Sequence, residues 1–441
     1  MTAATTPRRT TEPFREEHVA IKEHLRYMSR MIESIPGAAK KAMIMTLAAI
    51  GWLTLAAGPA AAADSACITC HEKVTPGIVK DWNKSAMAGK FDCTKCHGDQ
   101  HKNASDAAKV AMPTLETCKG CHKKQYDQYM AGKHSKAWIG MAAMPTNSFQ
   151  PHPYISGLKG CGGCHRVGIK PDEEKKYNRY GMGCNSCHTR HVFSKAEAQK
   201  PQACQTCHMG FDHPQWEMWS SSKHGSIALS GGDTGRAPVC QTCHMPGGDH
   251  GVKTAWGFLA LRLPEDDAEW MGYRATILKG LQVLDVDGKP TARLDVVKAG
   301  DVARLTKESF DAERSKMVDV CTKCHGAPFV KQNLKEADQM IKEADKVMAE
   351  AIEIVAGLYK DGIIKPQAGK PAYPDLLTFY DAQTPVEQTL YVMFLEHRMR
   401  AFQGAFHMNP DYVTWYGYAE LKKDIVEIRH ATETMRKEAK K

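Results

Sequence analysis

All 16 cysteines of this 441-residue chain fall into eight CxxC pairs, and a histidine directly follows each pair. A disulfide framework has no reason to place histidine after every second cysteine, so the pattern argues against one. The eight motifs are Cys67-Cys70-His71, Cys93-Cys96-His97, Cys118-Cys121-His122, Cys161-Cys164-His165, Cys184-Cys187-His188, Cys204-Cys207-His208, Cys240-Cys243-His244 and Cys321-Cys324-His325.

The CxxCH spacing is typical of covalent attachment of c-type haem. Two thiols separated by two residues can reach both vinyl groups along one edge of a porphyrin. The adjacent histidine then lies beneath the iron as its proximal ligand. One such motif could also be a zinc site or a redox-active cysteine pair, but eight motifs that use every cysteine favour haem. The sequence therefore predicts eight covalently bound c-type haems.

Twelve further histidines lie outside the motifs and could supply sixth ligands. A haem with two axial histidines carries electrons but binds no substrate, whereas an open sixth position binds one. The number of histidines permits eight bis-histidine haems, so counting alone identifies no open site. We expect His430, in a polar C-terminal helix, to be solvated. Apart from His18 and His24 near the N-terminus, the histidines are His101, His134, His152, His191, His213, His224, His250, His397, His407 and His430.

The N-terminal region has the three parts of a secretory signal peptide. Lys40 and Lys41 precede an apolar run at 42–58, and small residues follow up to Ala63. Cleavage near Ala63 is expected, and the alternative is a retained N-terminal anchor. The predicted location is therefore the periplasm or an equivalent compartment, with the protein soluble after cleavage. The net charge of +9 is spread along the chain, without the basic and aromatic clusters of nucleic-acid-binding proteins.

The sequence predicts a mainly α-helical multihaem cytochrome c, with a haem-rich N-terminal body, long C-terminal helices and little β structure. At this haem density, porphyrins are expected to replace much of the ordinary side-chain core. The predicted divisions are a leader and signal peptide at 1–63, a haem-rich domain with seven motifs at 64–250, a connecting region with the eighth motif at 251–330, and a helical domain at 331–441.

Local patterns predict the C-terminal helices. Apolar residues recur at helical spacing over 331–360, and the Asp-Gly pair at 361–362 is expected to end that helix. Thr384 precedes a proline and is predicted to cap a helix that runs to about Gly404, and Asn409 is predicted to open the last one. An Asp-Gly turn near 288 could form a small hairpin.

The chain resembles the octahaem hydroxylamine oxidoreductase family, which also includes hydrazine dehydrogenases, over roughly residues 64–430. The most specific segments are CHTRHVFSKAEAQKPQACQTCHMGFDHPQWEMWSSSKHG at 187–225, PTARLDVVKAGDVARLT at 290–306 and GAFHMNPDYVTWYG at 404–417. The octahaem nitrite and tetrathionate reductases carry a CxxCK motif at the catalytic site. Histidine in all eight motifs here speaks against those families.

The resemblance implies one catalytic, five-coordinate haem and seven bis-histidine haems. In the family the catalytic haem is the fourth in chain order, which corresponds here to the motif that ends at His165. His407 is implied as the seventh distal ligand, with His397 as second choice. The other six distal histidines carried over by local match are His101, His134, His152, His191, His224 and His250.

The resemblance also implies that Asp212 and His213 lie over the catalytic haem. Oxidation of hydroxylamine removes protons along with electrons, so a histidine oriented by a carboxylate is a suitable base. The alternative is that His213 is an eighth distal ligand. Oxidative members also join a tyrosine covalently to the catalytic porphyrin of a neighbouring subunit, which implies a homotrimer. Tyr412 is the best match for that tyrosine, with Tyr416 and Tyr418 close by.

The predicted function is oxidation of hydroxylamine to nitric oxide or nitrite, with electrons passed through the bis-histidine haems to a small cytochrome c. A first alternative is oxidation of hydrazine to dinitrogen. A second is the reverse reaction, reduction of nitrite or nitric oxide. Members that work in reverse lack the cross-linking tyrosine, so Tyr412 discriminates between the directions. A third alternative is a non-enzymatic electron conduit.

Overall fold

The structure is a computed structural model of the whole chain. It describes residues 65–142, 150–169, 183–210, 212–231, 235–252, 262–301, 303, 306–378 and 381–441. The predicted signal peptide, or anchor, lies outside these residues. Within the described ranges, none of the helices has the length and apolar character needed to cross a membrane.

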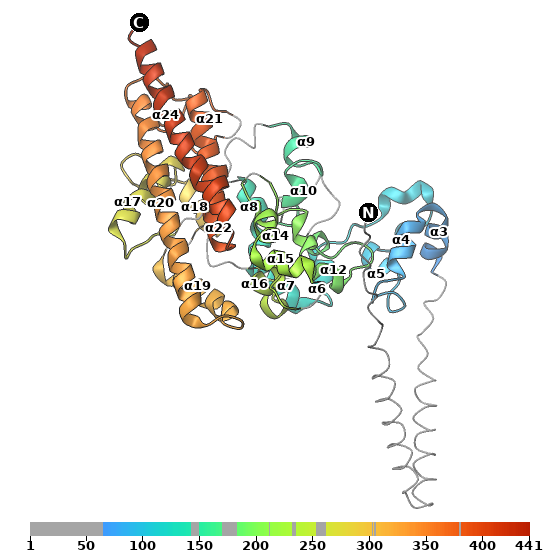
Figure 1. Cartoon of the computed structure of the whole chain (residues 1–441). Helices are drawn as coiled ribbons and strands as arrows, with labels where there is room; N and C mark the ends of the chain where they lie inside the picture. Colours follow the sequence, from blue (N-terminus) through green and yellow to red (C-terminus); the bar gives the residue numbers. More distant parts are fainter. Residues whose placement is uncertain are drawn as a thin grey trace, which may run out of the picture. The chain divides into compact units, whose positions relative to one another are not determined.

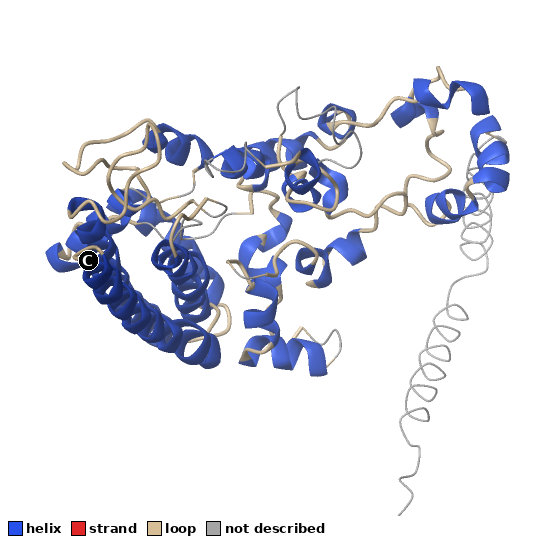
Figure 2. Ribbon diagram, turned by 90° about the horizontal axis from the view of Figure 1, so that it is seen from above, coloured by secondary structure: helices blue, strands red, loops and turns tan. Residues whose placement is uncertain are grey.

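The described part of the chain is built from helices and loops and contains no strand (Figure 2). This confirms the predicted mainly α-helical class. Near Gly288 the chain makes a tight turn in which the Asp285 N–H donates to the Lys289 carbonyl at 2.8 Å. Gly288 has a φ of +83°, which favours glycine at this position. The turn is therefore confirmed, and in place of a hairpin the structure has one isolated bridge between Leu284 and Pro290.

Contacts divide the chain into a small and a large unit. The described part of the small unit comprises 65–70 and 87–92, where Ser65 Oγ donates to the Asp92 carboxylate. The described part of the large unit comprises 71–86 and the residues from Cys93 onward.

Short helices carry the first seven motifs, and none of these helices exceeds nine residues. They are α3 (Ala66–Val74), α4 (Pro76–Trp82), α5 (Thr94–His97), η1 (Ala104–Lys109), α6 (Leu115–Lys119), α7 (Lys123–Ala131), η2 (His134–Lys136), α8 (Ala137–Ala142), α9 (His152–Ile155), α10 (Gly162–His165), η4 (Gly183–Ser186), α12 (Lys195–Ala198), α13 (Gln202–Gln205), α14 (Gln215–Ser220), α15 (Lys223–Ser230), α16 (Cys240–His244) and η5 (Pro246–Gly248).

The helices from Ala268 onward include the two longest of the described residues, α20 and α24. Among them, η6 and η7 are π-helical segments within longer helical runs. In Figure 1, α20 and α24 run side by side. The helices are α17 (Ala268–Gly280), α18 (Arg293–Gly300), α19 (Lys307–Cys321), α20 (Ala327–Lys360), α21 (Pro385–Val392), η6 (Met393–Arg398), α22 (Met399–Phe406), α23 (Pro410–Val413), η7 (Thr414–Tyr418) and α24 (Ala419–Glu438).

The predicted helix ends are confirmed. Asp361 caps α20, and Gly362 after it has a φ of +70°. Thr384 accepts the backbone N–H of Glu387 at the start of α21. Asn409 does the same for Tyr412 at the start of α23. The helix predicted over 331–360 begins slightly earlier, at Ala327, because Pro328 at its first turn extends it.

The main apolar core lies in the C-terminal part. The six positions predicted from helical spacing on α20 are all buried, and each large aliphatic side chain buried there contributes about 1.5–3 kcal/mol. Among the N-terminal helices the clustered core is small: Trp138, Met141 and Ile155, with Cys161 packed against them. This contrast fits the expectation that porphyrins supply the missing apolar interior. The six α20 residues are Leu334, Ala337, Ile341, Ala344, Met348 and Ile352.

A buried carboxylate ties three of the long helices together. Asp345 on α20 is fully buried and accepts from Trp270 Nε1 at 2.6 Å and from Arg398 at 2.8 Å. Arg274 on α17 also donates to it. Two buried guanidinium groups therefore depend on one carboxylate for their charge compensation.

Asp345→Asn is expected to destabilise this part of the protein by about 3–5 kcal/mol, because it leaves buried positive charge uncompensated. The loss of the helical circular dichroism signal in urea measures the effect. Asp361→Asn is the matched control, since Asp361 pairs with Arg436 at an exposed position. Equal stability of the two variants would contradict the structural role of Asp345.

Candidate functional site

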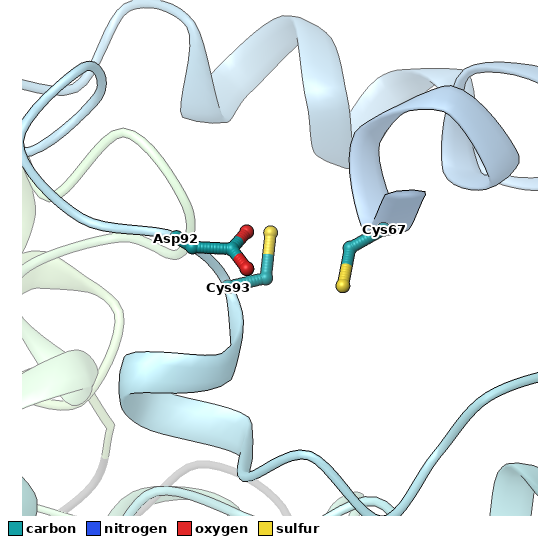
Figure 3. A group of neighbouring side chains, drawn as sticks. All are labelled: Cys67, Asp92 and Cys93. Carbon is teal, nitrogen blue, oxygen red and sulfur yellow. The ribbon is translucent and has the colours of Figure 1, made fainter. Parts of the chain in front are cut away.

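Each motif is shaped by one turn of helix. The His97 N–H donates to the Cys93 carbonyl at 3.0 Å, and the His165 N–H donates to Cys161 at 2.9 Å. Residues at i, i+3 and i+4 share one face of a helix, so both thiols and the imidazole face the same side. None of the 16 cysteines forms a disulfide, and Figure 3 shows the first cysteine of each of the first two motifs, on α3 and directly before α5.

Six motif histidines each face a second histidine from elsewhere in the chain. An iron bonded at roughly 2 Å to one nitrogen of each ring would separate the ring centroids by about 6 Å. The structure has this spacing in all six pairs, so the residues present fit bis-histidine haems. The pairs are His71–His101 at 6.1 Å, His97–His191 at 6.2 Å, His188–His250 at 6.3 Å, His208–His134 at 6.0 Å, His244–His407 at 6.4 Å and His325–His224 at 6.0 Å.

Three of the remaining histidines outside the motifs are not members of the six pairs. His152 is exposed at the start of α9 and is not a member of the six pairs. His397, the second choice for the seventh distal ligand, is buried in the helical core, where its Nδ1 lies 2.5 Å from an Asp424 carboxylate oxygen. His407 has the ring partner instead. His430 is exposed on α24, as predicted.

The fourth motif has its histidine fixed but outside the six pairs. His165 Nδ1 donates to the Ala137 carbonyl at 2.7 Å, which directs Nε2 of the ring to the other side. Burial lowers the pKa of His165 and keeps the ring neutral, the form that binds a metal. Asp212 and His213 lie close enough to act on it electrostatically.

Asp212 and His213 form a hydrogen-bonded pair that acts electrostatically on the fourth motif and also adjoins the sixth, whose His208 ring lies 6.4 Å from that of His213. His213 Nδ1 donates to the Asp212 carboxylate, and Nε2 donates to the Cys207 carbonyl at 2.9 Å. Burial opposes the charged ring, but the hydrogen bond and charge of Asp212 outweigh it and raise the pKa of His213. Because a carboxylate and a carbonyl can only accept, this geometry favours a ring with both protons. The pair can therefore hold a proton, and neither ring nitrogen is available as a metal ligand.

Gln403 on α22 joins this pair to the seventh motif, and sequence reasoning missed it. The Gln403 side-chain Nε2 donates to the Asp212 carbonyl at 3.1 Å, and the Gln403 backbone carbonyl accepts from His407 Nδ1 at 2.8 Å. Helical spacing could have indicated that Gln403 is buried, but no local pattern reveals its contact with Asp212.

Asp106 was also missed. Its carboxylate lies 2.9 Å from His101 Nδ1 and accepts from the backbone N–H groups of Lys102 and Asn103. These hydrogen bonds, that of Asn103 first, lower the pKa of Asp106 to about 2. The signal available in the sequence was the capping box that Asn103 and Asp106 form at the start of η1.

Tyr412 is half-buried on α23, with its ring centroid 4.9 Å from that of Tyr416. Burial, reinforced by the nearby Glu217 carboxylate, raises the pKa of Tyr412. Tyr416 and Trp415 are exposed, whereas Tyr418 packs against the helical core. The cross-link to a neighbouring subunit stays a prediction, and the structure places Tyr412 and Tyr416 near the surface.

Cysteines of different motifs meet, so haems attached to them would lie close together. Such proximity permits electron transfer between sites. Cys118 lies near Cys184, Cys164 near Cys207, and Cys204 near Cys240. The sixth motif thereby adjoins both the fourth and the seventh.

This chain is similar in sequence to a known protein. A probable nitrite reductase-hydroxylamine oxidoreductase fusion protein of Kuenenia stuttgartiensis is 26% identical over 480 residues, which cover 84% of this chain and 51% of that protein. The chain thus spans about half the length of this relative.

Two solved structures share the fold. A reducing HAO-like protein complex of Kuenenia stuttgartiensis has a TM-score of 0.64 and 24% identity, and the match covers 85% of each chain. A hypothetical multihaem protein has a TM-score of 0.62 and 21% identity, covering 85% of this chain and 96% of that one.

A family model described as "seven times multi-haem cytochrome CxxCH" matches residues 63–261 and 295–371, more than half of the chain. The motifs, the histidine pairs and the helical fold agree with this match. The family implies covalently bound c-type haems, and the relatives support the resemblance predicted from the sequence. The chain belongs to the multihaem CxxCH cytochrome family.

Proposed function

We propose that this protein is an octahaem enzyme that oxidises hydroxylamine to nitric oxide or nitrite at its fourth motif. The observation that carries the proposal is the Asp212–His213 pair beside His165, a histidine outside the six facing pairs. The similar proteins named as hydroxylamine oxidoreductase fusion and HAO-like complex support the same chemistry.

When bound at Cys161 and Cys164, haem supplies an iron that can bind the substrate nitrogen and take its electrons. The chain's own residues orient the proximal histidine and transfer protons. The Ala137 carbonyl holds the His165 ring in one tautomer, with Nε2 directed to the iron side. Asp212 fixes the Nδ1 proton of His213, so Nε2, which donates to the Cys207 carbonyl while protonated, is the atom that loses its proton above the pKa of His213 and can then accept one from the substrate.

The six facing pairs are assigned as axial ligands of the first, second, fifth, sixth, seventh and eighth haems. His152, which the resemblance gives as a distal ligand, is proposed for the third haem, opposite His122. This leaves His213 for proton transfer, in keeping with the engagement of both its ring nitrogens.

Haems held by the fourth and sixth motifs would lie close enough to exchange electrons, because Cys164 Sγ lies 3.8 Å from the carbonyl of Thr206, inside the sixth motif. Gln241 Nε2, inside the seventh motif, lies 3.8 Å from Cys204 Sγ, so the sixth and seventh haems would be neighbours as well. We propose a small cytochrome c as the acceptor, an exported protein as the setting, and a homotrimer in which Tyr412 reaches the fourth haem of a neighbouring copy.

The reverse reaction, reduction of nitrite or nitric oxide, is the second candidate. A doubly protonated His213 can donate a proton, which suits reduction. The printed descriptions of two similar proteins, a nitrite reductase fusion and a reducing complex, favour it as well.

Steady-state turnover of the purified holoprotein tests both. Hydroxylamine and hydrazine are supplied with an oxidised cytochrome c, and nitrite is supplied with a strong reductant, with products identified in each case. Hydroxylamine turnover that exceeds the other two supports the proposal. Faster nitrite reduction would favour the second candidate, dinitrogen from hydrazine would indicate a hydrazine dehydrogenase, and no turnover at all would leave an electron conduit.

A further inference from the structure

The two histidines of the first pair are held by different chemical groups. His71 Nδ1 lies 2.6 Å from the hydroxyl of Thr75, a neutral group. His101 Nδ1 lies 2.9 Å from a carboxylate oxygen of Asp106, a charged one. The two rings face each other at 6.1 Å, so the carboxylate acts on one side of a single haem site.

The polypeptide backbone fixes this carboxylate in place. The Lys102 N–H lies 3.0 and 3.1 Å from its two oxygens, and the Asn103 N–H lies 3.0 Å from Oδ1. Backbone N–H groups only donate, so they stabilise the ionised acceptor. Asp106 is also the third residue of the capping box that starts η1, which sets its side-chain direction.

Other paired histidines contact neutral acceptors. Backbone carbonyls and one side-chain amide hold them, and none of these groups carries a full charge. The contacts are His97 Nδ1 to Ala111 O at 2.9 Å, His250 Nδ1 to Gly248 O at 2.9 Å, His407 Nδ1 to Gln403 O at 2.8 Å and His208 Nδ1 to Gln215 Oε1 at 3.3 Å.

A carboxylate on the outer nitrogen of a ligating histidine makes the ring a stronger electron donor to the metal. This favours the oxidised, more positive iron over the reduced one. From this contrast we infer that Asp106 lowers the reduction potential of the haem that the first motif would hold. The inference rests on the proposed His71–His101 ligation.

In this arrangement Asp106 acts as a positioning and tuning residue, not a catalytic one.

Asp106→Asn in the full holoprotein tests the inference. Potentiometric titration followed by absorbance and electron paramagnetic resonance should show one low-spin haem moving to a higher potential. The expected change is on the order of tenfold in its reduction equilibrium, about 59 mV for one electron, with the other haems unmoved. Asp99→Asn removes an equal charge from an exposed nearby position, and Asn103→Ala weakens the cap but keeps the carboxylate.

Asp106→Asn with every low-spin potential unchanged would overturn the inference, as would an equal shift in either control. A new high-spin signal would also overturn it, because Asp106 would then merely support ligation. Hydroxylamine turnover is measured separately. If the holoprotein lacks turnover but shows the shift, the proposed function fails while the tuning role of Asp106 stands.

Discussion

Replacing His213 by alanine is expected to lower hydroxylamine turnover by about 10²–10⁴-fold while all haems remain bound. The ring is the group that accepts the substrate proton, and its removal acts on the chemical step. Intact mass under denaturing conditions measures haem content, with eight haems expected in both proteins. His430→Ala, at an exposed position on α24, is the matched control and should leave turnover unchanged.

The pH dependence of hydroxylamine turnover is a second test of the role of His213. Only the neutral ring accepts a proton, so oxidation should rise as the pH rises through the pKa of His213. Asp212 raises that pKa, so Asp212→Asn should move the transition to lower pH. A new high-spin haem signal in His213→Ala would contradict the assignment and make His213 a distal ligand.

Tyr412→Phe is expected to have the second largest effect, on assembly and direction together. A tyrosine bonded to the porphyrin of a neighbouring copy makes a trimer that survives denaturing electrophoresis, and phenylalanine cannot form that bond. The variant should therefore run as monomers and should lose oxidation of hydroxylamine relative to reduction of nitrite. Tyr416→Phe is the matched control, because its ring lies beside Tyr412.

A wild-type protein that already runs as a monomer, with eight ordinary haem spectra, would contradict the cross-link. Loss of the trimer in Tyr416→Phe alone would move the cross-link to that residue. The first result would strengthen the reductive candidate, to which the donor geometry of His213 already lends support.

The features that depend on local sequence could be predicted. The motifs need only a turn of helix, and the helix over 331–360 needs only apolar spacing, so both follow from the residues themselves. Thr384 and Asn409 cap their helices because a side-chain oxygen next to a free backbone N–H is sufficient. The family resemblance added the Asp212–His213 pair, which the structure brings to the fourth motif.

The remaining features depend on distant parts of the chain meeting. His244 and His407 are brought together by the packing of α22, and their spacing in sequence contains no sign of it. The same holds for the contact of the Gln403 side chain with the Asp212 carbonyl, which joins residues 191 positions apart. The turn near Gly288 could be recognised from local residues. Whether strands pair beside it could not, and the structure has one isolated bridge there in place of a hairpin.

Electron paramagnetic resonance of the oxidised holoprotein, with and without hydroxylamine, tests the central claim most directly. We predict one high-spin ferric haem among low-spin haems, and a change in the high-spin signal when substrate is added. Eight low-spin haems that hydroxylamine leaves unchanged would contradict the claim, because no open site would then exist beside Asp212 and His213.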